Sequence, residues 1–195
     1  MSEKVLRSKG IVKKYGKQEV LHNIDLTLEP GKIYGLIGRN GAGKTTLLSI
    51  LSAQNPATSG EIYLGEEPVW ENPVALQHIF FSREISPNVT GDSSGLKVKD
   101  YLDMAEAYLP KWDKKMAEEL VELFQLDRKK KTLKLSKGML SMLSIVLALA
   151  SKADFTFLDE PVSGLDVVAR EQFYRLLLEE FTESGRTFVI STHII

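Results

Sequence analysis

The sequence contains no cysteine among its 195 residues. Structural disulfides, thiolate metal sites and a cysteine nucleophile are therefore excluded, and a reducing cytosolic setting fits this composition. An excess of charge of one sign is also lacking, because 25 Lys and Arg balance 26 Asp and Glu to give a formal net charge of -1. This balance argues against a domain built mainly to hold nucleic acid.

Long apolar runs are missing as well. The longest lies around Ile145 to Ala150, far short of the ~20 residues that a membrane-spanning helix needs. The first residues, Met1 to Lys9, carry charges and no apolar stretch, so they do not form a secretory signal. If the protein works at a membrane, another chain is expected to cross it. A chain of 195 residues that is 43% hydrophobic predicts one domain with a packed core and a subsidiary lobe.

Strand and helix patterns alternate along most of the chain. Apolar and polar residues alternate from Val20 to Leu28, which predicts a half-buried strand. The nearly all-apolar run Ile33 to Ile37 predicts a central strand buried on both faces. Strands that alternate with helices predict an α/β fold with a largely parallel sheet, which binds ligands at the carboxyl ends of its strands. Further strands are expected at residues 61–64, 78–81, 155–158 and 187–191, and helices at residues 44–52, 100–109, 114–126, 141–150 and 167–181.

The middle of the chain has a different character. Residues 100–109 and 114–126 show apolar side chains at helical spacing and are separated by Pro110, as expected for two short helices. We therefore expect an inserted helical subdomain over residues 85–135, between the parts of an α/β core formed by residues 1–84 and 136–195.

The segment Gly38-Arg39-Asn40-Gly41-Ala42-Gly43-Lys44-Thr45 fits the pattern Gly-x4-Gly-Lys-Ser/Thr, and it lies between a predicted strand and a predicted helix. Its glycines let backbone N–H groups surround the β- and γ-phosphates, and the helix start adds partial positive charge. Lys44 supplies a full charge to the phosphates, and the Thr45 hydroxyl is placed to bind magnesium. An ordinary glycine turn is the alternative, and the strand–loop–helix context disfavours it. The sequence therefore predicts nucleotide binding.

An apolar strand from Phe155 to Leu158 ends in two acids, Asp159 and Glu160. Burying a carboxylate is costly unless a cation compensates for it, so these two acids predict a positively charged partner such as a metal ion. Asp159 is suited to hold magnesium, directly or through a water. Glu160 is suited to orient and deprotonate an attacking water. The alternative is a strand that ends in solvated acids, which the neighbouring phosphate loop disfavours.

With these motifs, the sequence resembles the nucleotide-binding domain of ABC transporters over residues 12–193, nearly the whole chain. The resemblance implies a P-loop NTPase fold with a largely parallel sheet and flanking helices, an N-terminal antiparallel β subdomain and an inserted helical subdomain. In that family an aromatic residue before the phosphate loop stacks on adenine, and Tyr15 matches it; a strand aromatic packed on the core is the alternative. The candidate ATP-binding residues are Tyr15, Gly38, Arg39, Asn40, Gly41, Ala42, Gly43, Lys44, Thr45 and Thr46.

The segment Leu135-Ser136-Lys137-Gly138-Met139 resembles the signature segment of the family, whose commonest form is Leu-Ser-Gly-Gly-Gln. Lys137 and Met139 depart from that form, whereas Ser136 and Gly138 match it. The resemblance implies that these two residues present a hydroxyl and a backbone N–H at a helix start to a γ-phosphate. A plain helix N-cap is the alternative interpretation of this segment.

Two further segments match the family, and one expected residue is missing. Ser163-Gly164-Leu165-Asp166 resembles the loop through which two sites of a dimer communicate, with Asp166 as the candidate residue; a turn that caps the next helix is the alternative. His193 after Thr192 resembles the switch histidine that contacts the γ-phosphate, against the alternative of a structural histidine. The usual glutamine after the 78–81 strand is replaced by Arg83, with Glu84 beside it, so the sensing of magnesium and water at this position is in question.

The resemblance implies an ATPase that uses Mg²⁺ with ATP and works as a head-to-tail pair, a homodimer or a heterodimer. The nucleotide-binding residues of one subunit would face Ser136 and Gly138 of the other. Closure on ATP would drive a transmembrane permease subunit on a separate chain, through a groove near Arg83. The chain would be cytoplasmic and peripheral on the inner face of the cell membrane. The signature variant and the separate ATPase chain resemble those of bacterial exporters.

A soluble ABC-type ATPase in DNA repair, chromosome organisation or translation is the competing hypothesis. Such proteins usually carry a long coiled coil or a second ATPase domain, and neither pattern appears in this sequence. The balanced charge predicts no nucleic-acid partner. A P-loop kinase or GTPase does not account for the signature segment, and the guanine-reading motif Asn-Lys-x-Asp is missing. Because the chain ends at Ile195, we expect a C-terminal truncation and an exposed sheet edge that favours non-native association.

Overall fold

The computed structural model describes residues 4–85 and 95–193 of the chain. The described residues divide into two compact units. The first takes in residues 4–81, 153–159 and 184–193, and the second takes in residues 82–85, 95–152 and 160–183. Part of the helical insert expected from the sequence, residues 86–94, lies outside the described residues.

The first unit contains an antiparallel sheet with the strand order β2-β1-β4-β5. Its strands are β1 (Leu6–Tyr15), β2 (Gln18–Leu28), β4 (Ser59–Leu64) and β5 (Glu67–Pro68). The alternating sequence of β2 gives an alternating burial pattern over part of the strand, as expected for a strand with one face on the core. The antiparallel β subdomain implied by the family resemblance is therefore confirmed.

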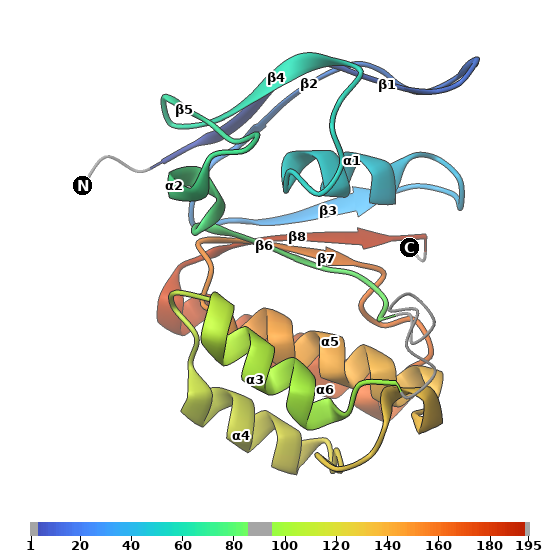
Figure 1. Ribbon diagram of the computed structural model, residues 1–195, viewed down its shortest axis with the longest axis vertical. Helices are drawn as coiled ribbons and strands as arrows, with labels where there is room; N and C mark the ends of the chain where they lie inside the picture. The colour runs from blue at the N-terminus through green and yellow to red at the C-terminus, as the bar shows by residue number, and fades with distance from the viewer. Residues whose placement is uncertain (1–3, 86–94, 194–195) are drawn as a thin grey trace. The chain divides into compact units, whose positions relative to one another are not determined.

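A second sheet has the order β3-β8-β7-β6. Its strands are β3 (Ile33–Ile37), β6 (Ile79–Ser82), β7 (Phe155–Asp159) and β8 (Thr187–Thr192). Strand β8 pairs in parallel with β3 and with β7, and the three arrowheads point the same way in Figure 1. The carboxyl ends of β3, β7 and β8 therefore meet at one edge, which confirms the predicted parallel sheet.

The prediction that Ile33 to Ile37 form a central strand was wrong in one respect. Among the described strands, β3 has a single neighbour, β8, and lies at the end of the sheet. Ile33 is 37% exposed and Ile37 is 56% exposed. A short apolar run identifies a strand but not the number of its neighbours. The strand itself was therefore predicted correctly, and its position within the sheet was predicted incorrectly.

Helix α1 (Lys44–Leu51) lies between the two sheets of the first unit (Figure 1). Its apolar side chains, with those of both sheets, form the core of this unit. Leu48 and Phe157 are fully buried there. Because α1 begins directly after the phosphate loop, its packing fixes the position of that loop. The unit also contains the short helix α2 (Pro73–Leu76).

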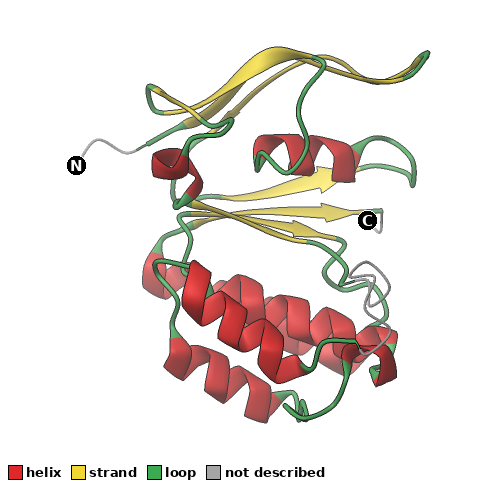
Figure 2. Cartoon of the chain, viewed as in Figure 1, coloured by secondary structure: helices red, strands yellow, loops and turns green. Residues whose placement is uncertain are grey.

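The second unit consists mainly of helices, shown in red in Figure 2. They are α3 (Val98–Tyr108), α4 (Lys114–Leu123), α5 (Lys137–Ala150) and most of α6 (Val167–Ser184), with a 3₁₀ turn at Thr132–Lys134. α5 packs against both α3 and α4, and most of its side chains are buried. Within the described ranges, no helix has both the length and the apolar character needed to cross a bilayer.

Candidate functional site

The loop between β3 and α1 has the conformation that its glycines were expected to allow. Gly41 and Gly43 have φ angles of +81° and +89°, a region that residues with a Cβ rarely adopt. A Cβ on Gly43 would also meet the side chains of Leu21 and Val20 at 3.0 and 3.3 Å. Glycine at this position therefore lets the backbone turn tightly into α1. The exposed residues of the loop are Arg39, Asn40, Gly41 and Ala42.

Lys44 is the first residue of α1 and is only 8% exposed. Its Nζ donates hydrogen bonds to the carbonyl oxygens of Gly38 at 2.6 Å and of Arg39 at 3.2 Å. These bonds hold a full positive charge against the backbone of the loop. Gly43 gives no side-chain cap, so the first N–H groups of α1 add partial positive charge at the same place. This arrangement suits an anion. The next candidates, Thr45 and Thr46, are exposed and half-buried respectively.

Asp159 ends β7 and is held by two hydroxyl groups. Ser191 of β8 donates its Oγ hydrogen to Asp159 Oδ1 at 2.5 Å, and Thr45 donates its Oγ1 hydrogen to Asp159 Oδ2 at 2.6 Å. One carboxylate oxygen is therefore fixed by the sheet, and the other faces the start of α1. The structure thus brings together Thr45 and Asp159, the two residues predicted to bind magnesium.

The donor set of Thr45 and Asp159 fits magnesium. Mg²⁺ prefers oxygen ligands and is usually held by one or two carboxylates together with waters and substrate phosphates. A hydroxyl oxygen and a carboxylate oxygen 2.6 Å apart supply ligands of this kind. The bond from Ser191 leaves the Asp159 carboxylate oriented toward Thr45.

Glu160 follows Asp159 in a strained backbone conformation, with a φ of 47°. A residue other than glycine in this region costs about 1–3 kcal/mol, and such residues cluster at active sites. The Oε1 atom of Glu160 is buried, and its carbonyl oxygen accepts a hydrogen bond from Ser163 N at 3.0 Å. This hydrogen bond closes the turn after β7 and fixes the backbone of Glu160.

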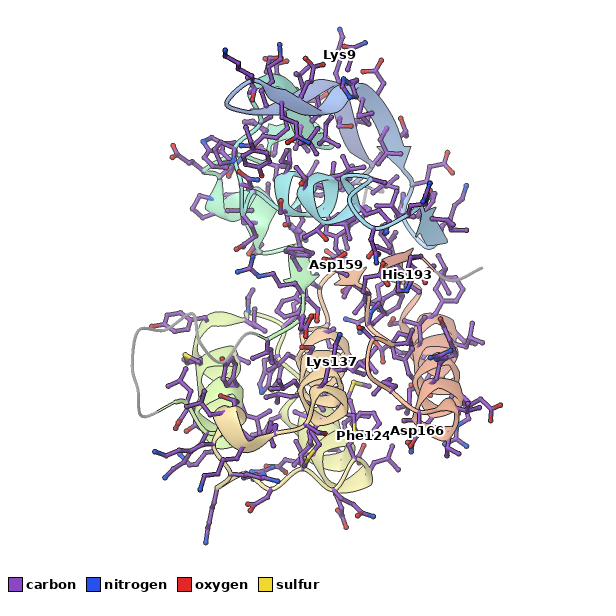
Figure 3. All side chains as sticks on the ribbon, turned by 90° about the vertical axis from the view of Figure 1, so that its right-hand side faces the viewer. Lys9, Phe124, Lys137, Asp159, Asp166 and His193 are labelled. Carbon is purple, nitrogen blue, oxygen red and sulfur yellow. The ribbon has the colours of Figure 1, made fainter. Side chains whose placement is uncertain are left out.

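His193 lies directly after β8 and is exposed. The carbonyl oxygen of the preceding Thr192 accepts a hydrogen bond from Gly38 N at 3.2 Å. Two residues earlier, Ser191 pairs with Asp159 across the parallel strands, and Figure 3 labels Asp159 and His193 at this edge. The sheet therefore brings the phosphate loop, Asp159 and His193 to one edge of the first unit.

In the second unit, Ser136 is the N-cap of α5. Its Oγ accepts a hydrogen bond from Met139 N at 3.2 Å. Gly138 packs against Gly164, because a Cβ on Gly138 would lie 2.8 Å from the Gly164 carbonyl oxygen. Both residues thus have structural roles within one chain, and their contact with a γ-phosphate stays a prediction.

Asp166 caps α6, as the structural alternative for its loop predicted. Its Oδ1 accepts a hydrogen bond from Ala169 N at 2.8 Å, and its carbonyl oxygen accepts one from Arg170 N at 3.0 Å. Ser141 of α5 donates its Oγ hydrogen to the Ser163 carbonyl oxygen at 2.5 Å. This loop therefore connects the starts of α5 and α6, and its role in communication between subunits stays a prediction.

Arg83 and Glu84, at the position of the usual glutamine, are both exposed. The Arg83 carbonyl oxygen accepts a hydrogen bond from Ser144 Oγ at 3.2 Å, so the backbone of this segment is attached to α5. The Glu84 carboxylate lies 4.0 Å from Lys137 Nζ. Both long side chains are thus placed at the surface of the second unit.

Tyr15 ends β1 and is 51% exposed, so it is not a core aromatic. Asn55 Nδ2 donates a hydrogen bond to its hydroxyl oxygen, and Lys13 Nζ lies over its ring. Sequence reasoning missed Lys13 and Asn55, because their contact depends on the fold and neither belongs to a motif. It also missed Ser191, for which a hydroxyl residue near the end of an apolar strand was a usable signal.

Comparison with known proteins agrees with this geometry. The family model described as ABC transporter matches residues 21–163. The chain is 33% identical over 90% of its length to the ABC transporter ATP-binding protein YtrB of Bacillus subtilis, and it spans 59% of that protein. It is 32% identical over 98% of its length to the lantibiotic transport ATP-binding protein SrtF of Streptococcus pyogenes, of which it spans 81%.

Among solved structures, the chain is similar to a dimeric, post-hydrolysis state of the ATP-binding cassette MJ0796 bound to ADP and Pi. The TM-score is 0.80 at 23% identity, and the alignment covers 97% of this chain and 88% of the other. At 23% sequence identity, this structural similarity establishes the fold alone. Together with the match of the family model over residues 21–163, it identifies the chain as a member of the ABC transporter family.

Proposed function

We propose that the chain binds and hydrolyses ATP as the nucleotide-binding subunit of an ABC transporter. The observation that carries this proposal is the edge of the parallel sheet, where the Lys44 ammonium lies against the phosphate loop and Thr45 contacts Asp159. A cationic loop next to an oriented hydroxyl–carboxylate pair suits a magnesium-bound triphosphate.

The phosphates would be held by the backbone N–H groups of the loop and by Lys44. Thr45 and Asp159 would hold Mg²⁺, which neutralises developing charge on the phosphates when it is bound. Asp159 is kept in position for this by the hydrogen bond from Ser191. Tyr15, half exposed at the end of β1, would stack on the adenine base.

Glu160 would act as the general base for the attacking water, and His193 would contact the γ-phosphate and position that water. Two observations favour Glu160 over Asp159 for this role. Both oxygens of Asp159 accept hydrogen bonds from hydroxyl groups, which holds this carboxylate in place for a metal. Glu160 follows directly after the strand with a φ of 47°, a strained conformation that is common at active sites.

We further propose a head-to-tail dimer in which Ser136 and Gly138 of one subunit meet the γ-phosphate held by the other, with Asp166 in the loop between the two sites. The dimeric cassette MJ0796 has the same fold. We also propose that residues 85–135 form the helical subdomain of this subunit. ATP contacts made only in the closed dimer would shift the population toward closure, and the segment around Arg83 would transmit this motion to a permease on a separate chain.

The proposed location is cytoplasmic, peripheral on the inner face of the cell membrane. The relatives YtrB and SrtF are named as transport ATP-binding proteins, which favours a transporter over a soluble ATPase of DNA repair or translation. SrtF is named for lantibiotic transport. We propose that this subunit powers the export of a peptide antibiotic or a similar compound.

The proposal is tested with Lys44→Ala and Glu160→Gln. Lys44→Ala should lose affinity for Mg-ATP, since the loop loses its full charge. Glu160→Gln should bind Mg-ATP like the parent chain but hydrolyse it about 10²–10⁴-fold more slowly, the range typical of a general base. Calorimetry gives the affinities and phosphate release gives the rates. A parent chain that shows no binding of Mg-ATP refutes the proposed function, and normal turnover by Glu160→Gln refutes the assignment of the base.

A further inference from the structure

Three residues of the first unit form a closed set of contacts around the Tyr15 ring. Asn55 Nδ2 donates a hydrogen bond to Tyr15 Oη at 2.7 Å. Lys13 Nζ donates a hydrogen bond to Asn55 Oδ1 at 2.9 Å and lies 5.0 Å from the centroid of the Tyr15 ring. Each of the three side chains therefore touches the other two.

Lys13 is buried to an extent that is unusual for a lysine, with 8% of its surface exposed. Burial of a charge is costly unless it is hydrogen-bonded, and Lys13 Nζ donates a further bond to the Pro56 carbonyl oxygen at 2.6 Å. A cation within about 6 Å of a ring centroid is attracted by the ring face. The ammonium is thus fixed on one face of Tyr15.

Asn55 has one orientation that satisfies both neighbours. A lysine ammonium only donates hydrogen bonds, so the Asn55 amide oxygen must face Lys13 and the amide nitrogen must face Tyr15. Asn55 is itself held by a backbone bond from its N–H to the Ser49 carbonyl oxygen of α1 at 3.2 Å. The helix that begins at the phosphate loop therefore also anchors the group that holds Tyr15.

We propose that Lys13 and Asn55 are positioning residues that fix the Tyr15 ring for stacking on the nucleotide base. The inference rests on the proposed function, in which Tyr15 contacts adenine. With the hydroxyl tied to Asn55 and one face covered by Lys13, the half-exposed ring offers its opposite face to the base. A ring held in advance loses less freedom when the base binds, and a cation on one face draws electron density from the face that stacks.

The test compares two ligands on the purified 195-residue chain. Mg-ATP uses the phosphate loop and the base site, whereas magnesium tripolyphosphate uses only the phosphate loop. Lys13→Met keeps the apolar stem and removes the charge. Asn55→Leu removes the two hydrogen bonds that the Asn55 side-chain amide makes with Tyr15 and Lys13. Each should raise the Kd for Mg-ATP about threefold to tenfold and leave the Kd for tripolyphosphate and the saturated hydrolysis rate unchanged. Lys13→Arg, which keeps a cation near the ring, should lose less affinity than Lys13→Met.

Lys14→Met is the matched control. Lys14 is the next residue of β1, its side chain is 49% exposed, and its Nζ pairs with Glu19 at 3.0 Å, a hydrogen bond that lowers the pKa of that carboxyl. Its removal should change neither Kd. Circular dichroism at the assay temperature checks that each variant is folded.

Three outcomes would overturn the inference. One is an equal loss of affinity for both ligands in Lys13→Met and Asn55→Leu, which would indicate a structural role. Another is no loss for either ligand. The third is a Tyr15→Ala variant with unchanged affinity for Mg-ATP, since Lys13 and Asn55 would then have no stacking ring to position. The proposed nucleotide binding survives all three, because it fails only if the parent chain does not bind Mg-ATP.

Discussion

At the scale of single residues, several candidate site residues also have a structural role. Ser136 uses its oxygen to accept the bond from Met139 N, but a serine hydroxyl also carries a hydrogen that it can donate. A helix N-cap and a phosphate contact are therefore compatible in one side chain. For Gly138, the structural role comes from its packing against Gly164, and this role has a direct test.

Gly138→Ala should lower the free energy of unfolding by about 1–3 kcal/mol, the range for an overpacked site. The added Cβ would lie 2.8 Å from the Gly164 carbonyl oxygen, and a backbone atom yields less easily than the end of a side chain. Gly35→Ala is the control, since its Cβ would meet Ile37 Cγ1 at an ordinary 3.9 Å. Denaturant unfolding measures both. Equal stability of the two variants would refute the packing role of Gly138.

At the scale of secondary-structure elements, an ion pair joins the helices of the second unit. Glu180 of α6 is 2% exposed, and its Oε2 lies 2.7 Å from Lys152 Nζ, just after the end of α5. Lys152→Met should lower the free energy of unfolding by about 3 kcal/mol, because it removes a cation from a buried carboxylate. Lys115→Met, which removes an exposed partner of Glu119 at 3.7 Å, should cost less than about 1 kcal/mol. If both variants lost a similarly small amount of unfolding free energy, the buried ion pair would not be the more important of the two.

The elements themselves were largely predictable, because their signals are local. The 3.6-residue and two-residue periodicities identified α6 and β2, and Pro110 marked the break between α3 and α4. The start of α5 was placed at Ser141 instead of Lys137, because Lys137 and Gly138 interrupt the apolar pattern. The N-cap Ser136 was the better signal for this boundary.

What depends on contacts between distant segments was not predictable. The exposed position of β3 follows from the strand order, and an apolar run such as Ile33 to Ile37 contains no information about that order. Likewise, the burial of Lys13 follows from the loop after α1, 43 residues later, whose Pro56 carbonyl accepts its hydrogen bond. Motif spacing identified Lys44, Thr45 and Asp159 correctly as neighbours, because a strand–loop–helix unit and a parallel sheet fix their positions.

At the scale of the whole molecule, the proposed dimer requires each ATP site to use both chains. Lys44 and Glu160 would belong to one half of a site, and Ser136 would belong to the half supplied by the neighbour. Residues from different halves can therefore complement one another when two defective chains are mixed, whereas residues from the same half cannot. This distinction separates a shared site from a site contained in one chain.

Ser136→Asp gives a defective chain that still folds, because Asp is as good an N-cap as Ser, while its charge would repel a γ-phosphate. Neither Ser136→Asp nor Lys44→Ala should hydrolyse ATP alone. An equal mixture should recover about a quarter of the parent rate, since half of the dimers are mixed and each mixed dimer has one intact site. Phosphate release measures this rate. A mixture of Lys44→Ala with Glu160→Gln should recover nothing, because both defects lie in the same half. If the first mixture is no more active than its components, Ser136 does not act across the dimer.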